Sequence, residues 1–419
     1  MLIRGNVVDR KQQNKIILIL GALAALGPFA IDMYLPGFPA IAKDLRTDIS
    51  HVALSLTSYF IGISVGQLIY GPLVDRFGRK KPLVIGLSLF VAASLGCALA
   101  PGVEWLIGLR LLLALGGCAG MVASRAVVRD VFPVKDIPKV FSTLVLVMGV
   151  APIVAPTIGG FVTASFGWRY IFVVLSAIGA LVLLIVGLLL PESKGADPTL
   201  SLKPKRVLGD FIGVLKEPVF LTYAIAASTA QAGLFAYITG SPFVFMEIFG
   251  LSETHYGWAF GLNAFGFIAG SQVNRLALKR STSEQVTFTA GTVQFSAGIL
   301  LLLGNYLGFL NADGSLLLIF FYMFSLGFIS PNATALALAP FARNAGSASA
   351  LMGSFQMAMG ALASALVSTL HNNTAIPMTG VMAGATVISV SLLVGFRRYS
   401  RRALAVTAAD RGVQGAKAA

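Results

Sequence analysis

The sequence predicts an all-α membrane protein whose helices cross the bilayer twelve times. Of its 419 residues, 56% are hydrophobic and only 11% are charged, whereas soluble domains carry about 25% charged residues. The apolar residues fall in runs of about 20, the length that a helix needs to span the hydrocarbon core. The 45 glycines fit this class, because small residues let membrane helices pack closely.

Twelve spans of this kind can be placed along the chain. They are expected near residues 16–38, 50–72, 82–100, 102–124, 139–162, 168–190, 218–240, 255–275, 284–303, 314–336, 345–369 and 374–395. If both termini face the cytoplasm, all but four of the 31 Lys and Arg residues lie in inner segments; the exceptions are Lys43, Arg46, Arg110 and Arg169. This bias is the one that orients membrane proteins, so it predicts cytoplasmic termini.

A hydrophilic connection at 191–217 divides the spans into two sets of six. The predicted parts are a cytoplasmic N-terminal tail (1–15), a six-helix bundle (16–190), a cytoplasmic linker (191–217), a second six-helix bundle (218–395) and a cytoplasmic C-terminal tail (396–419). A short sequence repeat, Gly-x-x-Val-(Asp/Asn)-Arg, occurs at 71–76 and again at 270–275. The same offset between the two halves aligns Asp32 with Gln231. This arrangement is expected of two pseudo-symmetric halves around a central site.

Asp32 is the only charged residue between positions 16 and 42. An ionised carboxylate in mid-membrane costs at least about 2.5 kcal/mol, so such residues usually line a water-filled path or carry protons. The short Asp side chain lies ~24 Å of helix from Ile16, too far to reach that interface. A proton- or ion-coupled transporter is therefore the leading hypothesis. Arg110 is a second charge inside a span, and two opposite charges in neighbouring helices would offset each other's desolvation cost; the alternative is a purely structural ion pair.

The loop after the second span carries a distinctive motif. It includes Gly71, Asp75, Arg76, Gly78, Arg79 and Lys80. The glycines permit tight turns, the aspartate can pair with an arginine or a helix N-terminus, and the basic residues mark the cytoplasmic face. The motif resembles the most diagnostic loop of the major facilitator superfamily. In that family the loop is a conformational latch that holds the two halves together in the outward-facing state.

Other motifs extend the resemblance over about 15–395. Arg110, followed by small residues, is similar to the family's fourth-helix motif, which is tied to proton transfer. The fifth span resembles the antiporter motif of drug exporters through Gly149, Pro152, Pro156, Gly159 and Gly160, although Ala155 replaces a usual glycine; an ordinary kinked helix is the alternative. Segments 26–36, 166–172 and 345–351 are similar to the bicyclomycin and chloramphenicol resistance branch.

The resemblance implies proton-coupled efflux of small, moderately hydrophobic drugs, such as phenicols or bicyclomycin, across a bacterial inner membrane. The expected partners are the drug, protons and the bilayer, without a cofactor, metal or nucleic acid, and a monomer is expected. Aromatic and amide residues that are candidates for the substrate cavity are Tyr34, Gln231, Phe235, Tyr237, Asn263 and Gln356. The alternative is a carrier of the same fold that exports a specific metabolite, an amino acid or a sugar.

An enzyme is not expected. The hydrolase-like pattern Gly-x-Ser-x-Gly at 62–66 lies inside an apolar span, and no predicted span interior contains the histidine that such a site requires.

Overall fold

The computed structural model describes residues 10–133, 137–197, 204–341 and 345–417, which form helices joined by short loops. The first half of the described chain contains α1 (Arg10–Asp32), η1 (Leu35–Gly37), α2 (Phe38–Asp44), α3 (Ile49–Phe77), α4 (Lys80–Ala98), α5 (Val103–Val131), α6 (Ile137–Phe166) and α7 (Arg169–Leu189). The second half contains α8 (Pro204–Leu215), α9 (Pro218–Pro242), η2 (Phe243–Ile248), α10 (Glu253–Ala277), α11 (Ser283–Tyr306), α12 (Ala312–Leu338), α13 (Ala345–Thr369) and α14 (Ile376–Lys417). Each predicted span overlaps one of these long helices.

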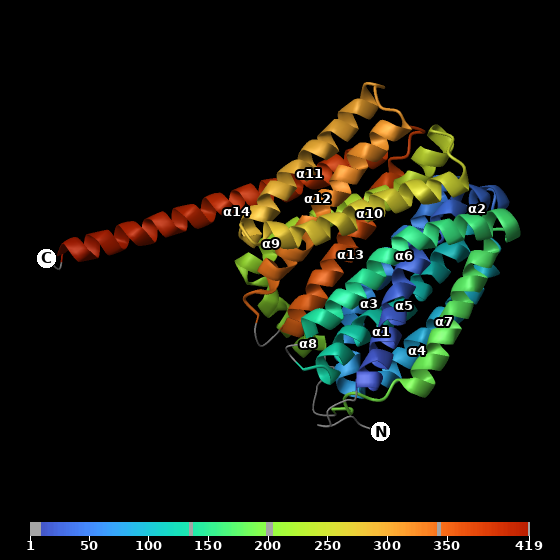
Figure 1. Ribbon diagram of the computed structural model, residues 1–419, viewed down its shortest axis with the longest axis horizontal. Coiled ribbons are helices and arrows are strands. Elements are labelled where there is room, and N and C mark those ends of the chain that lie inside the picture. The colour runs from blue at the N-terminus through green and yellow to red at the C-terminus, as the bar shows by residue number, and fades with distance from the viewer. Residues whose placement is uncertain (1–9, 134–136, 198–203, 342–344, 418–419) are drawn as a thin grey trace.

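Eleven helices in the described part of the chain are long and apolar enough to cross a membrane. The twelfth predicted span, 255–275, corresponds to α10, which is 25 residues long but includes the polar residues Asn263, Gln272 and Asn274. Figure 1 shows α10 running alongside α6 and α12, within the same bundle as the other long helices. The all-helical membrane fold predicted from the sequence is confirmed.

The long helices pack in two groups. Helices α1 and α3–α7 contact one another, and α9–α14 do the same. The groups meet mainly along two helix pairs, α3 with α13 and α6 with α10 (Figure 1). A bend of α1, described below, also brings η1 into contact with α9 and α10.

Several helix starts are fixed by polar side chains that bind otherwise unpaired backbone N–H groups. Asp48 caps α3, Ser252 caps α10 and Asn311 caps α12. Thr282 and Gln285 form a reciprocal capping box at the start of α11. These residues stand directly before apolar runs, and they set where each helix begins.

Three features depart from the expected layout. The first span is not one continuous helix, because α1 ends at Asp32 and the chain turns before η1 and α2. The linker contains the short helix α8, which contacts α9 and α13. The last helix does not stop near residue 395, because α14 continues to Lys417, well beyond the bundle in Figure 1.

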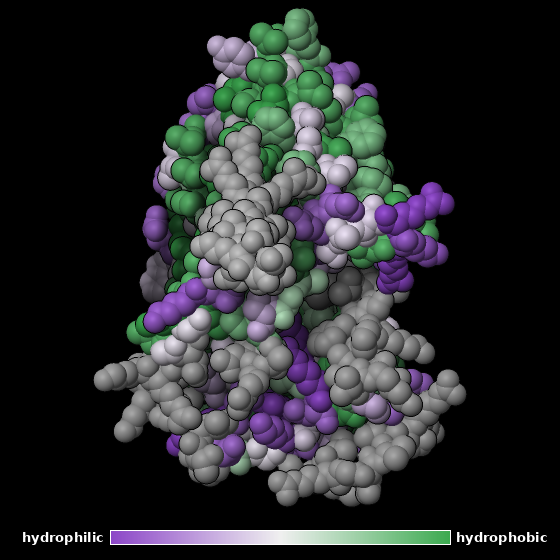
Figure 2. Space-filling model, turned by 90° about the vertical axis from the view of Figure 1, so that its left-hand side faces the viewer, coloured by the Kyte–Doolittle hydropathy of each residue, from purple (hydrophilic) through white to green (hydrophobic). Residues whose placement is uncertain are grey.

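The surface shows the division expected of a membrane protein. In Figure 2, hydrophobic residues dominate the upper part of the visible face, and hydrophilic residues gather in its lower part. Large apolar side chains that are exposed on the long helices include Leu95, Leu181, Leu188, Phe265 and Leu300. A soluble protein seldom exposes so many large apolar side chains, whereas lipid tails cover them without cost.

Candidate functional site

Asp32 is the last residue of α1, and the residue is only 4% exposed. The backbone just after α1 passes close to α6 at this point. A side chain at position 159 would overlap the carbonyl group of Met33, and Gly159 leaves this space free. Tyr59 on α3, Tyr237 on α9 and Tyr256 on α10 all lie within electrostatic range of the Asp32 carboxylate. A buried carboxylate at a helix break therefore lies within electrostatic range of tyrosines from both halves.

Arg110 is completely buried on α5. Its Nη1 donates a hydrogen bond to the carbonyl oxygen of Ala30 at 2.7 Å, and its guanidinium lies over the rings of Tyr34 (4.6 Å) and Tyr59 (4.4 Å). No ion pair joins it to Asp32 among the residues that the structure describes, so the expected pairing of these two charges is not seen. The reason is local: the last carbonyl groups of a helix lack intrahelical partners, and Arg110 binds one of those of α1. Its Nε and Nη2 atoms are buried without a hydrogen-bond partner.

The second half contains a buried polar pair. Asn263 Nδ2 on α10 donates to the hydroxyl oxygen of Tyr237 on α9 at 3.0 Å, and the Tyr237 ring stacks on Phe260 at 5.4 Å. Close by, the hydroxyl groups of Tyr256 and Ser241 share a hydrogen bond of 2.8 Å. The structure thus brings Tyr237 and Asn263, two of the predicted cavity residues, together, with Tyr237 within electrostatic range of Asp32.

The other predicted cavity residues are more scattered. Tyr34 is fully buried within the first half, where its hydroxyl bonds to Ser55 at 3.0 Å. Phe235 packs on Phe60 of the opposite half, with ring centroids 4.6 Å apart. Gln231 and Gln356 are half-buried. Tyr34 therefore serves packing in this conformation, and Phe235 belongs to the contact between the halves.

The antiporter-motif residues lie along α6, the helix that packs on both α1 and α10. Pro152 and Pro156 are inside this helix. Gly149 faces Ile268 and Gly160 faces the backbone of Glu253, both on α10, while Gly159 faces α1. The glycines thus remove side chains where the backbones of α1, α6 and α10 approach closely. Gly159 and Gly160 thus let α6 pack closely on both halves near Asp32.

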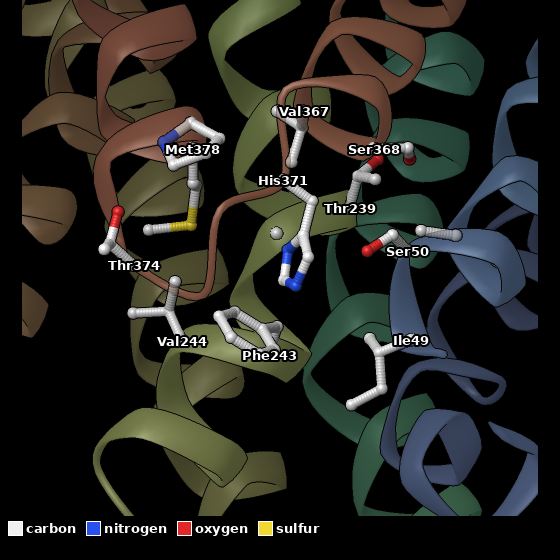
Figure 3. A pocket seen from close by; sticks show the side chains of 13 residues that line it. Ile49, Ser50, Thr239, Phe243, Val244, Val367, Ser368, His371, Thr374 and Met378 are labelled. Carbon is white, nitrogen blue, oxygen red and sulfur yellow. The ribbon is translucent and has the colours of Figure 1, made fainter. Parts of the chain in front are cut away.

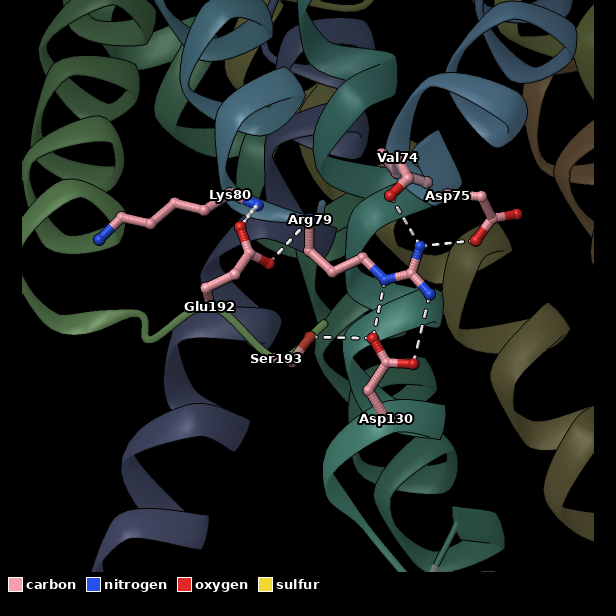
Figure 4. A network of polar contacts seen from close by, with 7 residues as sticks. All are labelled: Val74, Asp75, Arg79, Lys80, Asp130, Glu192 and Ser193. Carbon is pink, nitrogen blue, oxygen red and sulfur yellow. Dashed lines mark hydrogen bonds and ion pairs between the residues drawn. The ribbon is translucent and has the colours of Figure 1, made fainter. Parts of the chain in front are cut away.

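The motif loop between α3 and α4 forms a dense network of polar contacts, shown in Figure 4. Arg79 binds Asp130 at the end of α5 through Nε (2.7 Å) and Nη2 (3.3 Å). Its Nη1 donates to Asp75 at 2.6 Å and to the Val74 carbonyl oxygen at 2.8 Å. Burial lowers the pKa of Arg79, but the bonds to Asp130 and Asp75 outweigh that effect and hold its pKa above the ordinary value.

Glu192, just after α7, completes this network. Its carboxylate accepts hydrogen bonds from the backbone N–H groups of Arg79 (2.8 Å) and Lys80 (3.1 Å) at the start of α4, where a helix favours negative charge. Gly78 adopts a φ of 83°, a left-handed conformation that favours glycine. The Lys80 side chain bonds to the carbonyl oxygen of Gly187 at 2.7 Å.

The remaining loop residues lie on α3. Gly71 has open space where a side chain would be, and the Arg76 carbonyl oxygen accepts a hydrogen bond from the backbone of Asp197 at 3.0 Å. Sequence analysis missed Asp130 and Glu192 as partners of the motif. Their only sequence signal is an acidic residue at the inner end of a span, which is common to many helices.

The two halves are also joined by hydroxyl groups along α3 and α13. Ser64 and Ser354 share a hydrogen bond of 3.0 Å, and Thr57 bonds to Ser364 at 2.7 Å. Thr239 on α9 donates to Ser364 at 2.9 Å. The Ser64–Ser354 and Thr57–Ser364 contacts are neutral and buried, so they join the halves without placing a charge between them.

A pocket lies near the ends of α3, α9 and α13, where residues of both halves meet. Figure 3 shows His371 pointing into it beside Phe243, with Ser50 and Thr239 on the opposite wall. The His371 and Phe243 rings meet edge to face at 4.4 Å. None of the predicted cavity residues lines this pocket. Among the described residues, no group of three or more His, Cys, Asp or Glu side chains is placed to hold a metal ion.

A bundle of long apolar helices with a buried carboxylate between two halves defines a multi-pass membrane transport protein. The family model described as Major Facilitator Superfamily matches residues 17–364. The chain belongs to the major facilitator superfamily.

Relatives and solved structures agree with this assignment. The chain is 37% identical over 391 residues to the uncharacterized MFS-type transporter YdgK of Bacillus subtilis, covering 93% of this chain and 96% of the relative. It is 35% identical to a bicyclomycin resistance protein homolog of Haemophilus influenzae (89% and 94% covered) and 28% identical to the multidrug resistance protein MdtL of Escherichia coli (91% and 95%). These matches confirm the resemblance to the drug-resistance branch.

Among solved structures, the xylose transporter XylE from E. coli superposes with a TM-score of 0.71 at 14% identity, covering 92% of this chain and 98% of that one. The nucleoside transporter NupG superposes with a TM-score of 0.71 at 13% identity (91% and 99% covered). At such identities the likeness shows the shared fold alone.

Proposed function

We propose that this transporter exports small, moderately hydrophobic drugs in exchange for protons. The observation that carries the proposal is the position of Asp32, a buried carboxylate at the break in α1, within electrostatic range of tyrosines of both halves. A group that gains or loses charge at this boundary changes how the halves interact. Relatives named for bicyclomycin and multidrug resistance support drugs as the substrate class.

The cycle follows from charge and burial. The inward-facing protein with ionised Asp32 takes up the drug from the cytoplasm or the inner leaflet. After opening outward, it releases the drug and Asp32 accepts a proton. The neutral carboxyl no longer opposes the return through the apolar bundle, and its proton leaves to the inside. Each inward proton gains about 2.3 kcal/mol per 100 mV of membrane potential, so one proton supports roughly tens-fold drug accumulation.

The proposal includes an orientation of the protein in the membrane. The basic segments place both termini, the linker and the loop between α3 and α4 in the cytoplasm, with the protein in a bacterial inner membrane and acting as a monomer. In this arrangement the loop from Gly71 to Lys80 is the conformational latch. Its network around Arg79 fixes the inner ends of α3, α4 and α5 as one rigid unit, which can then dock as a whole against the second half.

Drug-triggered proton movement tests the proposal. Inverted vesicles that contain the protein are given a preformed pH gradient and then chloramphenicol, florfenicol or bicyclomycin. The wild type should collapse the gradient, and Asp32→Asn should not, because an amide cannot carry the proton. Asp313→Asn, the same change at an exposed residue of α12, should behave as the wild type.

Two outcomes oppose the proposal in different ways. If Asp32→Asn responds like the wild type, the carboxylate is structural and the coupling mechanism is wrong. If no drug produces a response in the wild type, export of a specific metabolite becomes the leading function, and a substrate scan would identify it.

A further inference from the structure

The boundary between α3 and α13 is closed at one end and open at the other. The two helices run antiparallel and are in contact where Thr57 bonds to Ser364 at 2.7 Å. Nearer the end of α3 and the start of α13, a carbon added at Gly71 or at Gly346 would meet nothing within 4 Å. In the proposed orientation this open end faces the cytoplasm, and the closed end faces the outside.

Ser364 is the centre of the closed end. Its hydroxyl bonds to Thr57 of α3 at 2.7 Å and accepts a hydrogen bond from Thr239 of α9 at 2.9 Å. The backbone carbonyl oxygen of Ser364 also accepts a bond from Ser368, one turn farther along α13, at 3.0 Å. Ser364 is 0% exposed. One buried hydroxyl therefore ties α3 of the first half to two helices of the second half.

The pocket described above adjoins this contact. Thr239 and Ser368, which both bond to Ser364, also line the pocket, and Figure 3 shows them in the same pocket as Ser50 of α3 and His371. The pocket volume of about 20 Å³ is enough for about one water molecule. A drug therefore cannot pass here while the two halves stay in contact.

An aromatic contact lies on the other side of Ser364, toward the middle of α3 and α13. Phe60 of α3 and Phe235 of α9 are buried, and their ring centroids are 4.6 Å apart. Gly360, one turn from Ser364 on α13, leaves space for the Phe235 ring, which a side chain there would overlap. Phe60 follows Thr57 by three residues, so both contacts use the same face of α3. The hydroxyl contact thus separates the pocket from an apolar contact deeper in the boundary.

A hydroxyl contact suits a boundary that must open and close. Hydrogen bonds between neutral groups contribute little net free energy when water can replace them, and the pocket places water beside Ser364. The boundary between α6 and α10 is different, because Gly257 packs on the backbone of Thr157 and Gly160 on that of Glu253. Water cannot replace such packing contacts. The Ser364 contact is therefore the part of the outer boundary that water opens most readily.

We propose that Ser364 locks the outer side of the boundary, and that the outward-facing state begins when water from the pocket replaces its bonds to Thr57 and Thr239. The inference rests on the function proposed above and makes Ser364 a positioning residue for drug release. The opened boundary leads from Phe60 and Phe235 past Ser364 to the pocket. Among the described residues that line this pocket there is no Lys, Arg, Asp or Glu, so the exit favours uncharged drugs.

Labelling of a cysteine from the outside tests the lock. Right-side-out vesicles that contain Ser368→Cys are treated with a thiosulfonate reagent that carries a fixed positive charge and cannot cross the membrane. The water-sized pocket should keep labelling slow at rest, and chloramphenicol with a pH gradient should make it several-fold faster, because transport opens the boundary. The natural cysteines, Cys97 and Cys118, are buried, and the wild type gives their background. Ser315→Cys, buried near the outer end of α12, should show no such acceleration.

Two variants weaken the lock itself. In the Ser368→Cys protein, Ser364→Ala and Thr57→Val should each raise the resting labelling rate about fivefold, the factor that corresponds to one hydrogen bond. Thr57→Val keeps the side-chain shape and serves if Ser364→Ala does not fold. Thr287→Val is the matched control, because the Thr287 hydroxyl bonds within its own helix to the Ser283 carbonyl oxygen at 2.7 Å, and it should leave the rate unchanged. Unchanged resting rates in both Ser364→Ala and Thr57→Val would overturn the inference.

Failure of this inference is distinguishable from failure of the proposed function. If wild-type vesicles exchange drug for protons while the lock variants label at the unmodified rate, only the role of Ser364 is wrong. If the lock variants label faster but no drug moves protons in the wild type, the lock stands and the proposed function fails. Labelling of Ser368→Cys in inverted vesicles alone would reverse the orientation and overturn both.

Discussion

The Arg79 network predicts that Asp130 contributes more to stability than the motif residue Asp75. The Arg79 side chain is 6% exposed, the Asp130 side chain 17% and the Asp75 side chain 52%. Breaking a buried, two-point ion pair costs about 3 kcal/mol, because the remaining charge stays desolvated. An ion pair with one solvated partner is worth below about 1 kcal/mol. Asp130→Asn should therefore destabilise the protein several times more than Asp75→Asn.

Unfolding of the purified protein in mixed micelles, titrated with a denaturing detergent, measures the two free energies. The effect of Asp130→Asn should shrink when Arg79 is already replaced by Gln, since the pair is then broken in both proteins. Ser193, which also bonds to Asp130 at 2.9 Å, provides a neutral comparison through Ser193→Ala. Equal losses for Asp75→Asn and Asp130→Asn would refute the reasoning from burial.

Two further predictions concern contacts around the boundary between the halves. Gly159→Ala should destabilise the protein by about 1–3 kcal/mol, because a methyl group there meets the Met33 backbone. The same unfolding titration measures this loss. Gly21→Ala is the control that should be tolerated, because its added carbon lies 3.6 Å from Val147. The double variant Ser64→Cys, Ser354→Cys should form a disulfide on oxidation, because the two hydroxyl oxygens are 3.0 Å apart in the wild type. Drug-triggered proton movement should stop when the disulfide forms and resume when it is reduced. Transport that continues in the cross-linked protein would show that α3 and α13 need not separate.

Span positions were predictable because a bilayer imposes one simple requirement, about 20 apolar residues in a helix. Even α10, which is too polar for the hydropathy criterion that the other eleven helices meet, was placed correctly at 255–275, between turn residues on each side. The break at Asp32 was not predictable in the same way. Hydropathy continues through Tyr34 and Leu35. The helix ends at Asp32 because Pro36 has no N–H to bond the Asp32 carbonyl, and Gly159 then leaves space for α6 against the Met33 carbonyl, a contact between residues far apart in sequence.

The motif loop shows a similar limit. The pattern of glycine, aspartate and arginine predicted a tight, charged turn, and Gly78 adopts the positive φ that such a turn requires. The principal partners of Arg79 and of the α4 N-terminus are nevertheless Asp130 and Glu192. They come from the ends of α5 and α7, and their meeting depends on the lengths and tilts of three helices. Local sequence carries no information on that register.

The end of α1 explains why the two buried charges do not pair. A helix C-terminus is the negative end of its dipole and leaves carbonyl oxygens unpaired, so it attracts Arg110 to Ala30. The same negative end disfavours an ionised carboxylate at the terminal residue, Asp32. The broken helix therefore has two effects. It provides an acceptor for Arg110, and it disfavours negative charge at Asp32. A continuous helix through residue 38 would do neither, because Ala30 would bond within the helix. The break in α1, rather than the mere presence of an aspartate and an arginine in the membrane, is what would suit this site to the proposed proton coupling.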